Sequence, residues 1–248
     1  MSKELTGKVA LVTGGTRGLG REIALGLARA GVSVVVASRK AEACAQVAAE
    51  IAEATGADVL GQPCHVGKWS DVNNLIETVY DRFGRLDVLV NNAGMSPLYG
   101  SLSELSEELF DKTLAVNLKG PFRLAALAGT RMAQAGGGSI INISSTGAVK
   151  PDPVSLPYAA AKAGLNATTI GMARAFGPTV RVNAIMPGPF LTDISKAWDM
   201  PAMQAWVDTF ALRRFGQPSE IVGAVLYFAS DASSYTTGAV LTIDGGQS

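Results

Sequence analysis

Tyr158 and Lys162 are the residues whose types and spacing point most directly to chemistry. They lie four positions apart in Tyr-Ala-Ala-Ala-Lys, a run of good helix formers, so they share one helix face. A free tyrosine titrates near pH ~10, and an ammonium about 4 Å away at an effective dielectric of about 20 would favour its phenolate by about 4 kcal/mol. The pair therefore predicts a tyrosine that exchanges protons near neutral pH. An ordinary pair on a helix surface is the alternative.

Ser145 is expected at the same place. It ends the segment 138–145, whose small and apolar residues predict a strand, and it precedes Tyr158 by thirteen positions. If the chain folds back between the two, the serine hydroxyl would donate to a carbonyl oxygen that gains negative charge when hydride arrives.

The segment 8–20 predicts a phosphate-binding turn. An apolar run over 8–13 is typical of a strand buried on both faces, glycines follow it, and 21–30 has helical spacing. Backbone N–H groups and the positive helix end then point at an anion that the glycines allow to approach. A tight turn without a ligand is the alternative. The loop residues that we expect at a dinucleotide are Gly14, Thr16, Arg17, Gly18, Leu19 and Gly20.

The end of the second expected strand, 32–38, predicts which dinucleotide is bound. An NAD site commonly has a carboxylate about 20 residues beyond the glycine loop, where it accepts a hydrogen bond from the ribose 2′-hydroxyl. This chain has Ser38, Arg39 and Lys40 there, with Arg17 in the loop itself. Because guanidinium groups pair with phosphate, NADP(H) is preferred over NAD(H). Alternatively, Arg39 and Lys40 are solvated residues that open the next helix.

Expected strands and helices alternate along the chain. Further strands are expected over 58–66, 86–90, 138–145, 180–186 and 239–243, and helices over 41–55, 69–83, 106–134, from Tyr158 onward and over 218–229. Such alternation implies parallel strands, helices on both faces, and ligands beyond the carboxyl ends of the strands. Pro121 lies inside 106–134, so we expect that helix to kink or be re-bonded locally near Asn117.

Composition excludes several classes of protein. The 248 residues are 48% hydrophobic with zero formal net charge, which favours one α/β domain over 1–248 and argues against a nucleic-acid partner. We find neither an apolar leader nor a membrane span, and we expect a cytoplasmic protein without a membrane partner. His65 is the only histidine, and Cys44 and Cys64 have no zinc spacing, so no metal site is expected and both cysteines are interpreted as packing residues.

The segment at about 188–215 is rich in large apolar residues. We interpret it as a mobile lid over a substrate, and a subunit interface is the alternative. The apolar residues concerned are Trp198, Met200, Met203, Trp206 and Phe210.

Together these motifs resemble the short-chain dehydrogenase/reductase family in its compact form, over essentially the whole chain. The matching motifs are Thr13-Gly-x3-Gly18-x-Gly20, Asn91-Asn92-Ala93-Gly94, Asn117, Ser145, Tyr158-x3-Lys162, Pro187-Gly188 and Asp244-Gly245-Gly246. The resemblance implies a Rossmann-type, doubly wound sheet of seven parallel strands with helices on both faces. It also implies an NAD(P)(H)-dependent oxidoreductase without a metal, assembled as a homotetramer or homodimer through the helices containing Asn117 and Tyr158.

The resemblance also implies a role for individual residues. Tyr158 is then the acid in carbonyl reduction and the base in alcohol oxidation, and Lys162 lowers its pKa and holds the nicotinamide ribose. Ser145 positions the substrate oxygen, and Asn117 anchors a water that links Lys162 to solvent. The remaining cofactor contacts are expected at His65, Val66, Asn91, Ala93, Gly94, Pro187, Gly188 and Thr192. His65 stands where relatives often have an aspartate that binds adenine, which leaves that contact open.

The function predicted from these residues is an NADP(H)-dependent carbonyl reductase or alcohol dehydrogenase for a small to medium, apolar ketone or secondary alcohol. The substrate contacts are expected at Ser145, Met95, Val149, Tyr158, Pro189 and Phe190. A 3-oxoacyl-[acyl-carrier-protein] reductase is an alternative, weakened by the thin basic character around Thr179. A non-catalytic dinucleotide-binding protein is a third possibility, against which the four intact catalytic positions argue.

Overall fold

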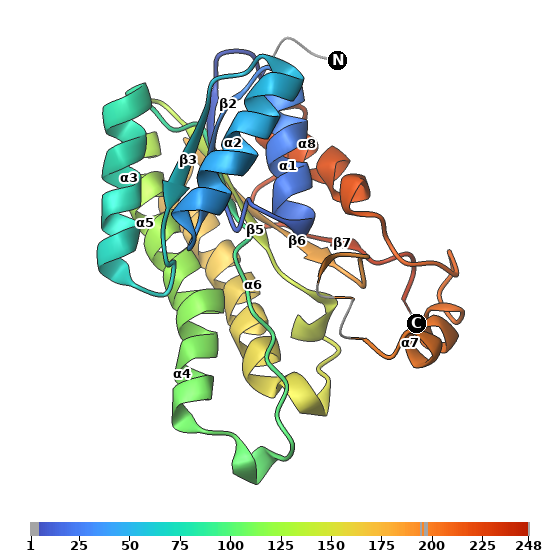
Figure 1. The fold of residues 1–248 in the computed structure, drawn as a ribbon. Coiled ribbons are helices and arrows are strands. Elements are labelled where there is room, and N and C mark those ends of the chain that lie inside the picture. Colours follow the sequence, from blue (N-terminus) through green and yellow to red (C-terminus); the bar gives the residue numbers. More distant parts are fainter. Residues whose placement is uncertain (1–4, 194, 196–197, 248) are drawn as a thin grey trace.

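A computed structural model of the chain describes residues 5–193, 195 and 198–247. The described residues form one sheet of seven parallel strands in the order β3-β2-β1-β4-β5-β6-β7, with helices on both faces (Figure 1). The strands are β1 (Val9–Thr13), β2 (Ser33–Ser38), β3 (Val59–Pro63), β4 (Val88–Asn91), β5 (Gly138–Ile143), β6 (Val180–Pro187) and β7 (Val240–Ile243). The predicted doubly wound, Rossmann-type sheet is therefore confirmed.

Strand β1 shows why the central strands carry apolar residues at successive positions. Ala10 and Val12 pack into a hydrophobic cluster on one face of the sheet, whereas Val9 and Leu11 pack into a second cluster on the other face. Successive strand residues point to opposite faces, so a strand covered by helices on both sides needs apolar residues throughout.

The helices divide between the two faces of the sheet (Figure 1). The first cluster is closed by α1 (Gly18–Arg29), α2 (Ala41–Thr55) and α8 (Val222–Ala229). The second is closed by α3 (Trp69–Phe83), α5 (Gly120–Gln134) and α6 (Leu156–Phe176). Each helix in the described part of the chain is too short or too polar to cross a lipid bilayer.

Element ends agree with the sequence pattern where a clear stop signal exists. Helices α2 and α3 have the predicted bounds, and each is followed by a glycine in the left-handed region, Gly56 with φ 72° and Gly84 with φ 71°. The strand expected over 58–66 is shorter and ends at Pro63, and the chain then turns over 65–68, where Lys68 N–H donates to the carbonyl of His65 at 2.8 Å. Both cysteines are free and buried, which confirms their interpretation as packing residues.

The stretch predicted as one helix over 106–134 contains a π-helical turn. It runs as α4 (Glu107–Leu114), the π turn Ala115–Lys119 and α5, with Pro121 in the first turn of α5. Proline has no N–H to offer the carbonyl of Asn117 four residues earlier, so the regular hydrogen-bond pattern is interrupted here. The expected local rearrangement near Asn117 is confirmed.

The segment after β6 builds a small core of its own. Val207, Phe210 and Phe215 are buried together, with Leu191, Trp198 and Met203 packed against them. Helix α7 (Met200–Val207) belongs to this segment, and its Met200 and Trp206 are each 39% exposed. The apolar residues predicted to form a lid thus divide between an internal cluster and an outer face. Residues 194, 196 and 197 of the predicted lid lie outside the described residues.

Candidate active site

The carboxyl ends of β1 and β4 meet where the strand order reverses, and they are tied together by hydrogen bonds. Thr13 Oγ1 accepts from the backbone N–H of Asn92 and of Ala93, both at 3.1 Å. The Asn92 amide donates to the carbonyls of Thr13 at 2.9 Å and Gly14 at 3.2 Å. Such a reversal point is where parallel α/β sheets bind their ligands, and these bonds fix the glycine loop beside it.

Close backbone packing explains the glycines of this loop. A Cβ at Gly20 would lie 2.2 Å from the carbonyl oxygen of Gly14, and one at Gly14 would lie 2.9 Å from Cα of Ala93. Gly14 has φ 64° and Gly18 has φ 51°, values that favour glycine. Leu19 packs against the hydrophobic cluster under α1. The loop is therefore held in one conformation by its contacts.

The N-terminus of α1 fits an anionic ligand. Arg17 is the N-cap, yet its side chain makes no capping hydrogen bond with any described residue, and the first turn of the helix contains no acidic residue. The first N–H groups of a helix lack intrahelical partners and attract negative charge. This end of α1 can therefore hold the phosphates of a dinucleotide.

A cleft of about 480 Å³ lies between the glycine loop and the residues after β6. Thr16, Arg17 and Gly18 line one side, and Thr192 lines the other. The methyl carbon of Thr192 would lie 3.4 Å from a Cβ on Gly18. The structure thus brings Thr192 to the predicted phosphate site.

Basic side chains are available at the end of β2. Ser38 is half-buried, and Arg39 and Lys40 after it are exposed. Arg21 pairs with Glu50 at 3.0 Å, whereas Arg17 and Arg39 form no ion pair with any described carboxylate. The register of β1 and β2 places Thr13 opposite Ala37, so the glycine loop and this strand end are neighbours.

His65 and Val66 follow β3 at the same edge of the sheet. The Nδ1 atom of His65 accepts from Gly67 N–H at 3.2 Å, and its backbone N–H donates to Asp71 at 3.1 Å. Val66 is buried, and its carbonyl lies 2.3 Å from where a Cβ on Gly120 would be. This turn is therefore packed against the start of α5.

Ser145 and Tyr158 converge, as predicted. The Ser145 Oγ accepts from Gly147 N–H at 3.1 Å. A Cβ on Gly147 would lie 3.4 Å from that oxygen and 3.8 Å from Cε1 of Tyr158. Because the serine oxygen accepts a bond from the protein backbone, its own hydroxyl hydrogen is left to donate elsewhere.

Lys162 is buried beside Tyr158, with 3% of its surface exposed. Its Nζ donates to the carbonyl oxygen of Ile143 at 2.6 Å and lies 5.7 Å from the centre of the Tyr158 ring. Burial lowers the pKa of Lys162 from 10.5 to about 8. An ammonium is therefore held at the end of β5 at neutral pH.

The pKa of Tyr158 is shifted in the direction opposite to the sequence-based expectation. Burial raises its pKa above 10.0, and a side-chain hydrogen bond with Ser145 opposes that rise. At neutral pH Tyr158 is thus a neutral phenol that can donate its proton.

Asn117 is bonded to the residues that follow β4, and these residues pass close to Lys162. Its Nδ2 donates to the carbonyl of Met95 at 2.8 Å and of Thr113 at 2.9 Å, and its Oδ1 accepts from Met95 N–H at 3.2 Å. A Cβ on Gly94 would lie 2.9 Å from Asn117 Oδ1 and 3.8 Å from Lys162 Nζ. Gly94 is therefore the point where Asn117 and Lys162 meet.

Asn91 requires a correction. We expected Asn91 at the cofactor groove, and its side chain is 1% exposed and donates to Asn142 at 2.9 Å and to the carbonyl of Pro121 at 3.3 Å. Asn142 in turn donates to Thr169 of α6 at 2.8 Å. The side chain of Asn91 thus ties β4 to β5 and α6, and only its backbone can face a ligand.

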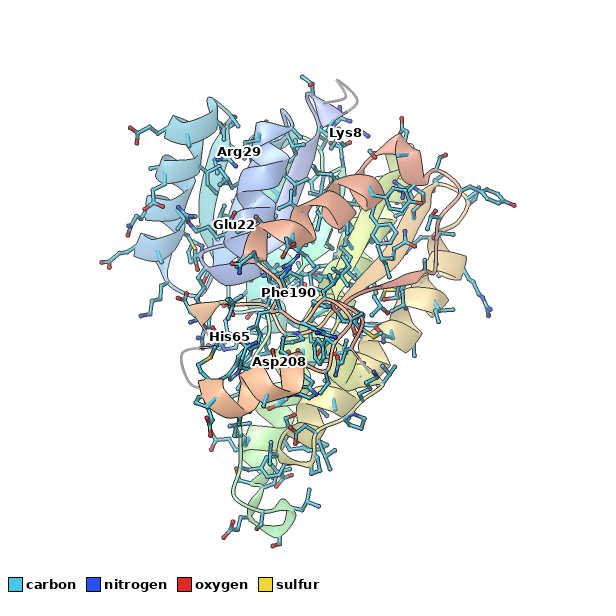
Figure 2. All side chains as sticks on the ribbon, turned by 90° about the vertical axis from the view of Figure 1, so that its right-hand side faces the viewer. Lys8, Glu22, Arg29, His65, Phe190 and Asp208 are labelled. Carbon is cyan, nitrogen blue, oxygen red and sulfur yellow. The ribbon has the colours of Figure 1, made fainter. Side chains whose placement is uncertain are left out.

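Phe190 also requires a correction. Its ring is 6% exposed and packs in the hydrophobic cluster under α1, so it does not line a substrate pocket. Gly216 flanks the ring and accepts from Leu191 N–H at 2.9 Å, while its own N–H donates to Pro189 at 3.0 Å. In the view of Figure 2, Phe190 is labelled below Glu22 of α1 and above Asp208, which follows α7.

The other predicted pocket residues lie on separate segments. Val149 is 60% exposed, Met95 and Pro189 are half-buried, and Pro187 is buried in β6. Gly188 N–H donates to Ile243 at 2.9 Å, and a Cβ on it would lie 2.9 Å from Cα of Asp244. The C-terminal Asp244 motif therefore holds the turn that follows β6.

Three contacts in this site were not assigned from the sequence. They are the Asn92 amide under the glycine loop, the Ile143 carbonyl that receives Lys162, and the Met95 backbone that receives Asn117. The adjacent asparagines at 91 and 92 were a visible signal for the first. The other two use backbone atoms, for which residue identity gives no signal.

Comparison with known proteins identifies the family. The sequence profile described as "Enoyl-(Acyl carrier protein) reductase" matches residues 14–248. The chain is 38% identical over 245 residues to "Dehydrogenase/reductase SDR family member 4" of Homo sapiens, covering 98% of this chain and 88% of that protein. It is 39% identical over 244 residues to "D-threitol dehydrogenase" of Mycolicibacterium smegmatis, covering 98% and 93%.

A solved structure agrees with these sequence relatives. The NADPH-dependent 3-quinuclidinone reductase from Rhodotorula rubra superimposes with a TM-score of 0.93 at 33% identity, covering 99% of this chain and 92% of that one. The described sheet, the glycine cradle and the Ser145, Tyr158 and Lys162 constellation are consistent with this likeness. The chain belongs to the short-chain dehydrogenase/reductase family and is an oxidoreductase that acts on CH–OH or C=O groups.

Proposed function

We propose that the protein is an NADP(H)-dependent carbonyl reductase that uses Asn117, Ser145, Tyr158 and Lys162. The observation that carries the proposal is the convergence of these residues beside the cradle at the end of β1. Ala93 is bonded to Thr13 of the cradle, and a Cβ on Gly94 after it would contact both Asn117 Oδ1 and Lys162 Nζ. A dinucleotide in the cleft would therefore end at the catalytic side chains.

The proton transfer follows from the positions of two hydroxyl groups. NADPH, when bound, supplies the hydride that adds to the carbonyl carbon. Ser145 donates a hydrogen bond to the carbonyl oxygen, and Tyr158 transfers its phenolic proton to that oxygen, so that the ketone becomes a secondary alcohol. Lys162 stabilises the negative charge that then develops on Tyr158.

The raised pKa of Tyr158 fits the protonation state that carbonyl reduction needs at its start. Carbonyl reduction requires a protonated phenol at the start, whereas alcohol oxidation requires a phenolate. Because burial raises the pKa of Tyr158, the neutral form predominates before reaction. The reverse reaction depends on the positive charge of Lys162 to offset that burial.

The preference for NADP(H) rests on Arg17 and Arg39. Neither is engaged by a carboxylate among the described residues, and Ser38 and Lys40 lie beside them. Two guanidinium groups can form charge-assisted bonds with a ribose 2′-phosphate. The NADPH dependence named for the Rhodotorula rubra reductase supports the same choice.

We place the substrate among small to medium ketones and secondary alcohols. The names of the relatives include a reductase of 3-quinuclidinone and a dehydrogenase of D-threitol. The profile description names an acyl-carrier-protein substrate. A carrier protein is acidic and would need a free basic side chain near Thr179, but the Arg181 guanidinium is already hydrogen-bonded within the protein. This guanidinium donates to Ser233 Oγ at 2.5 Å and to the carbonyls of Phe228 and Ser230 at 2.9 and 3.1 Å.

The outer faces of the central helices support assembly as a homodimer or homotetramer. Phe110 of α4, Phe122 of α5 and Ile170 of α6 are 40%, 44% and 42% exposed. Burial of these side chains against a second copy would remove apolar surface from water.

Tyr158→Phe should lower kcat by a factor on the order of 10² to 10⁴ because the proton donor is lost. The affinity for NADPH, measured by fluorescence titration, should stay unchanged. The assay is a panel of cyclic ketones, polyol-derived ketoses and acetoacetyl thioester, with NADPH and NADH in parallel. Tyr227→Phe, whose hydroxyl pairs with Thr236 at 3.0 Å, is the matched control. Retention of most activity by Tyr158→Phe would reject the mechanism.

Arg39→Ala should raise the KM for NADPH on the order of tenfold to a hundredfold, because a charge-assisted hydrogen bond is lost. The KM for NADH should change little, since NADH lacks the 2′-phosphate. Arg29→Ala removes another exposed guanidinium, at the C-terminal end of α1 and away from the glycine loop, and should leave both values unchanged (Figure 2). Equal effects of Arg39→Ala on the two cofactors would contradict the assignment.

Lys162→Met should change the pH dependence of stability. The Lys162 pKa is about 8 in the folded protein and 10.5 as its ordinary value, so between these pH values the unfolded chain binds more protons. The unfolding free energy of the wild type should therefore rise relative to Lys162→Met by about 1.4 kcal/mol per pH unit in this window.

Urea denaturation of the two proteins from pH 7 to pH 10.5 measures this difference. Below pH 8 the buried ammonium destabilises the wild type most, so Lys162→Met should be the more stable protein there and inactive. Lys68→Met, an exposed lysine, is the control. A constant difference between wild type and Lys162→Met across the window would show that Lys162 is not held as a buried cation.

A further inference from the structure

We propose that Tyr99 is a positioning residue for Tyr158 and that its hydroxyl holds the first turn of α6 in place. The inference rests on the proposed function of Tyr158 and adds a residue from a different segment. Tyr99 Oη accepts from the backbone N–H of Leu156 at 3.1 Å and donates to the carbonyl of Pro153 at 2.6 Å.

The start of α6 lacks the support that a helix usually has. The helix begins at Leu156, and the side chain of Ser155, its N-cap, makes no capping bond within the described part of the chain. Pro157 has no N–H, so Leu156 carries the first free donor of the helix. The Tyr99 hydroxyl satisfies that donor and thus replaces a cap with a bond from another segment.

Tyr158 lies in the same first turn, two residues after Leu156. Its ring therefore moves with that turn, and a small displacement would change the distance from its hydroxyl to the substrate oxygen. Misplacement of a reacting group by about 1 Å can slow an enzyme by about 10²-fold. The bond from Tyr99 limits such a displacement.

The segment that carries Tyr99 is anchored at its other end by a second catalytic residue. Asn117 bonds to both the N–H and the carbonyl of Met95, at 3.2 and 2.8 Å. Between these two attachments Leu98 is 70% exposed, so packing of its side chain contributes little to holding the segment. Figure 1 shows the chain after β4 running down beside the start of α6 before it reaches α4. Residues 95–99 therefore connect Asn117 to the helix of Tyr158.

Tyr99→Phe removes only the hydroxyl and tests the proposal by two measurements. The amide of Leu156 should exchange with solvent faster, by hydrogen-exchange NMR of the ligand-free protein, because its acceptor is gone. The kcat for the best ketone in the panel should fall on the order of tenfold, while the Kd for NADPH stays unchanged. Tyr235→Phe, at a fully exposed tyrosine, is the matched control and should change neither.

Three results would overturn the proposal. The first is an unchanged exchange rate of the Leu156 amide. The second is faster exchange of that amide with an unchanged kcat. The third is a rise in the Kd for NADPH as large as the fall in kcat. Thermal unfolding of Tyr99→Phe checks that the fold is retained, and Tyr99→Leu repeats the exchange measurement if it is not. The exchange rate needs no turnover, so a failure of the proposed function in Tyr158→Phe is distinguishable from a failure of this inference.

Discussion

The proposed chemistry depends on a cation that the fold keeps out of water. Lys162 is nearly completely buried, and the described hydrogen bond of its ammonium is to the carbonyl of Ile143 at the end of β5. At 5.7 Å and an effective dielectric of about 20, it would stabilise a charge on the Tyr158 ring by about 3 kcal/mol, or about two pKa units. Burial of the phenol acts in the opposite direction. The acidity of Tyr158 is therefore set by the balance between these two effects.

The fold supplies the rigid surroundings that this balance requires. Asn91, Asn142 and Thr169 form a buried chain of hydrogen bonds that joins β4, β5 and the part of α6 that follows Lys162 to one another. A second set of bonds from Thr13 and Asn92 places the glycine cradle at the same edge. One edge of one sheet thus positions both the glycine loop and the tyrosine that we propose as the proton donor.

Much of this arrangement could be predicted from the sequence because it depends on local patterns. The glycines that follow α2 and α3 predicted where these helices end. The spacing of Tyr158 and Lys162 predicted that they share one helix face. The buried positions of the Asn91 side chain and of Phe190 could not be predicted, because burial depends on which element packs above them. The direction of the Tyr158 pKa shift could not be predicted either, because desolvation depends on the whole three-dimensional surroundings.

The pKa of Tyr158 in Lys162→Arg and in Lys162→Met is the most direct test of the central claim. The Lys162 pKa is about 8 and that of Tyr158 is raised, so the wild-type ammonium is lost before Tyr158 titrates, whereas a guanidinium stays charged. The chain has five tyrosines, so NMR titration of ring-labelled protein gives few signals, and Tyr158→Phe assigns the one of interest. If a buried cation at position 162 offsets the burial of the phenolate, the Tyr158 pKa should be lower in Lys162→Arg than in Lys162→Met by about two units. The same pKa in both variants would contradict the claim that a buried cation at this position controls the acidity of Tyr158.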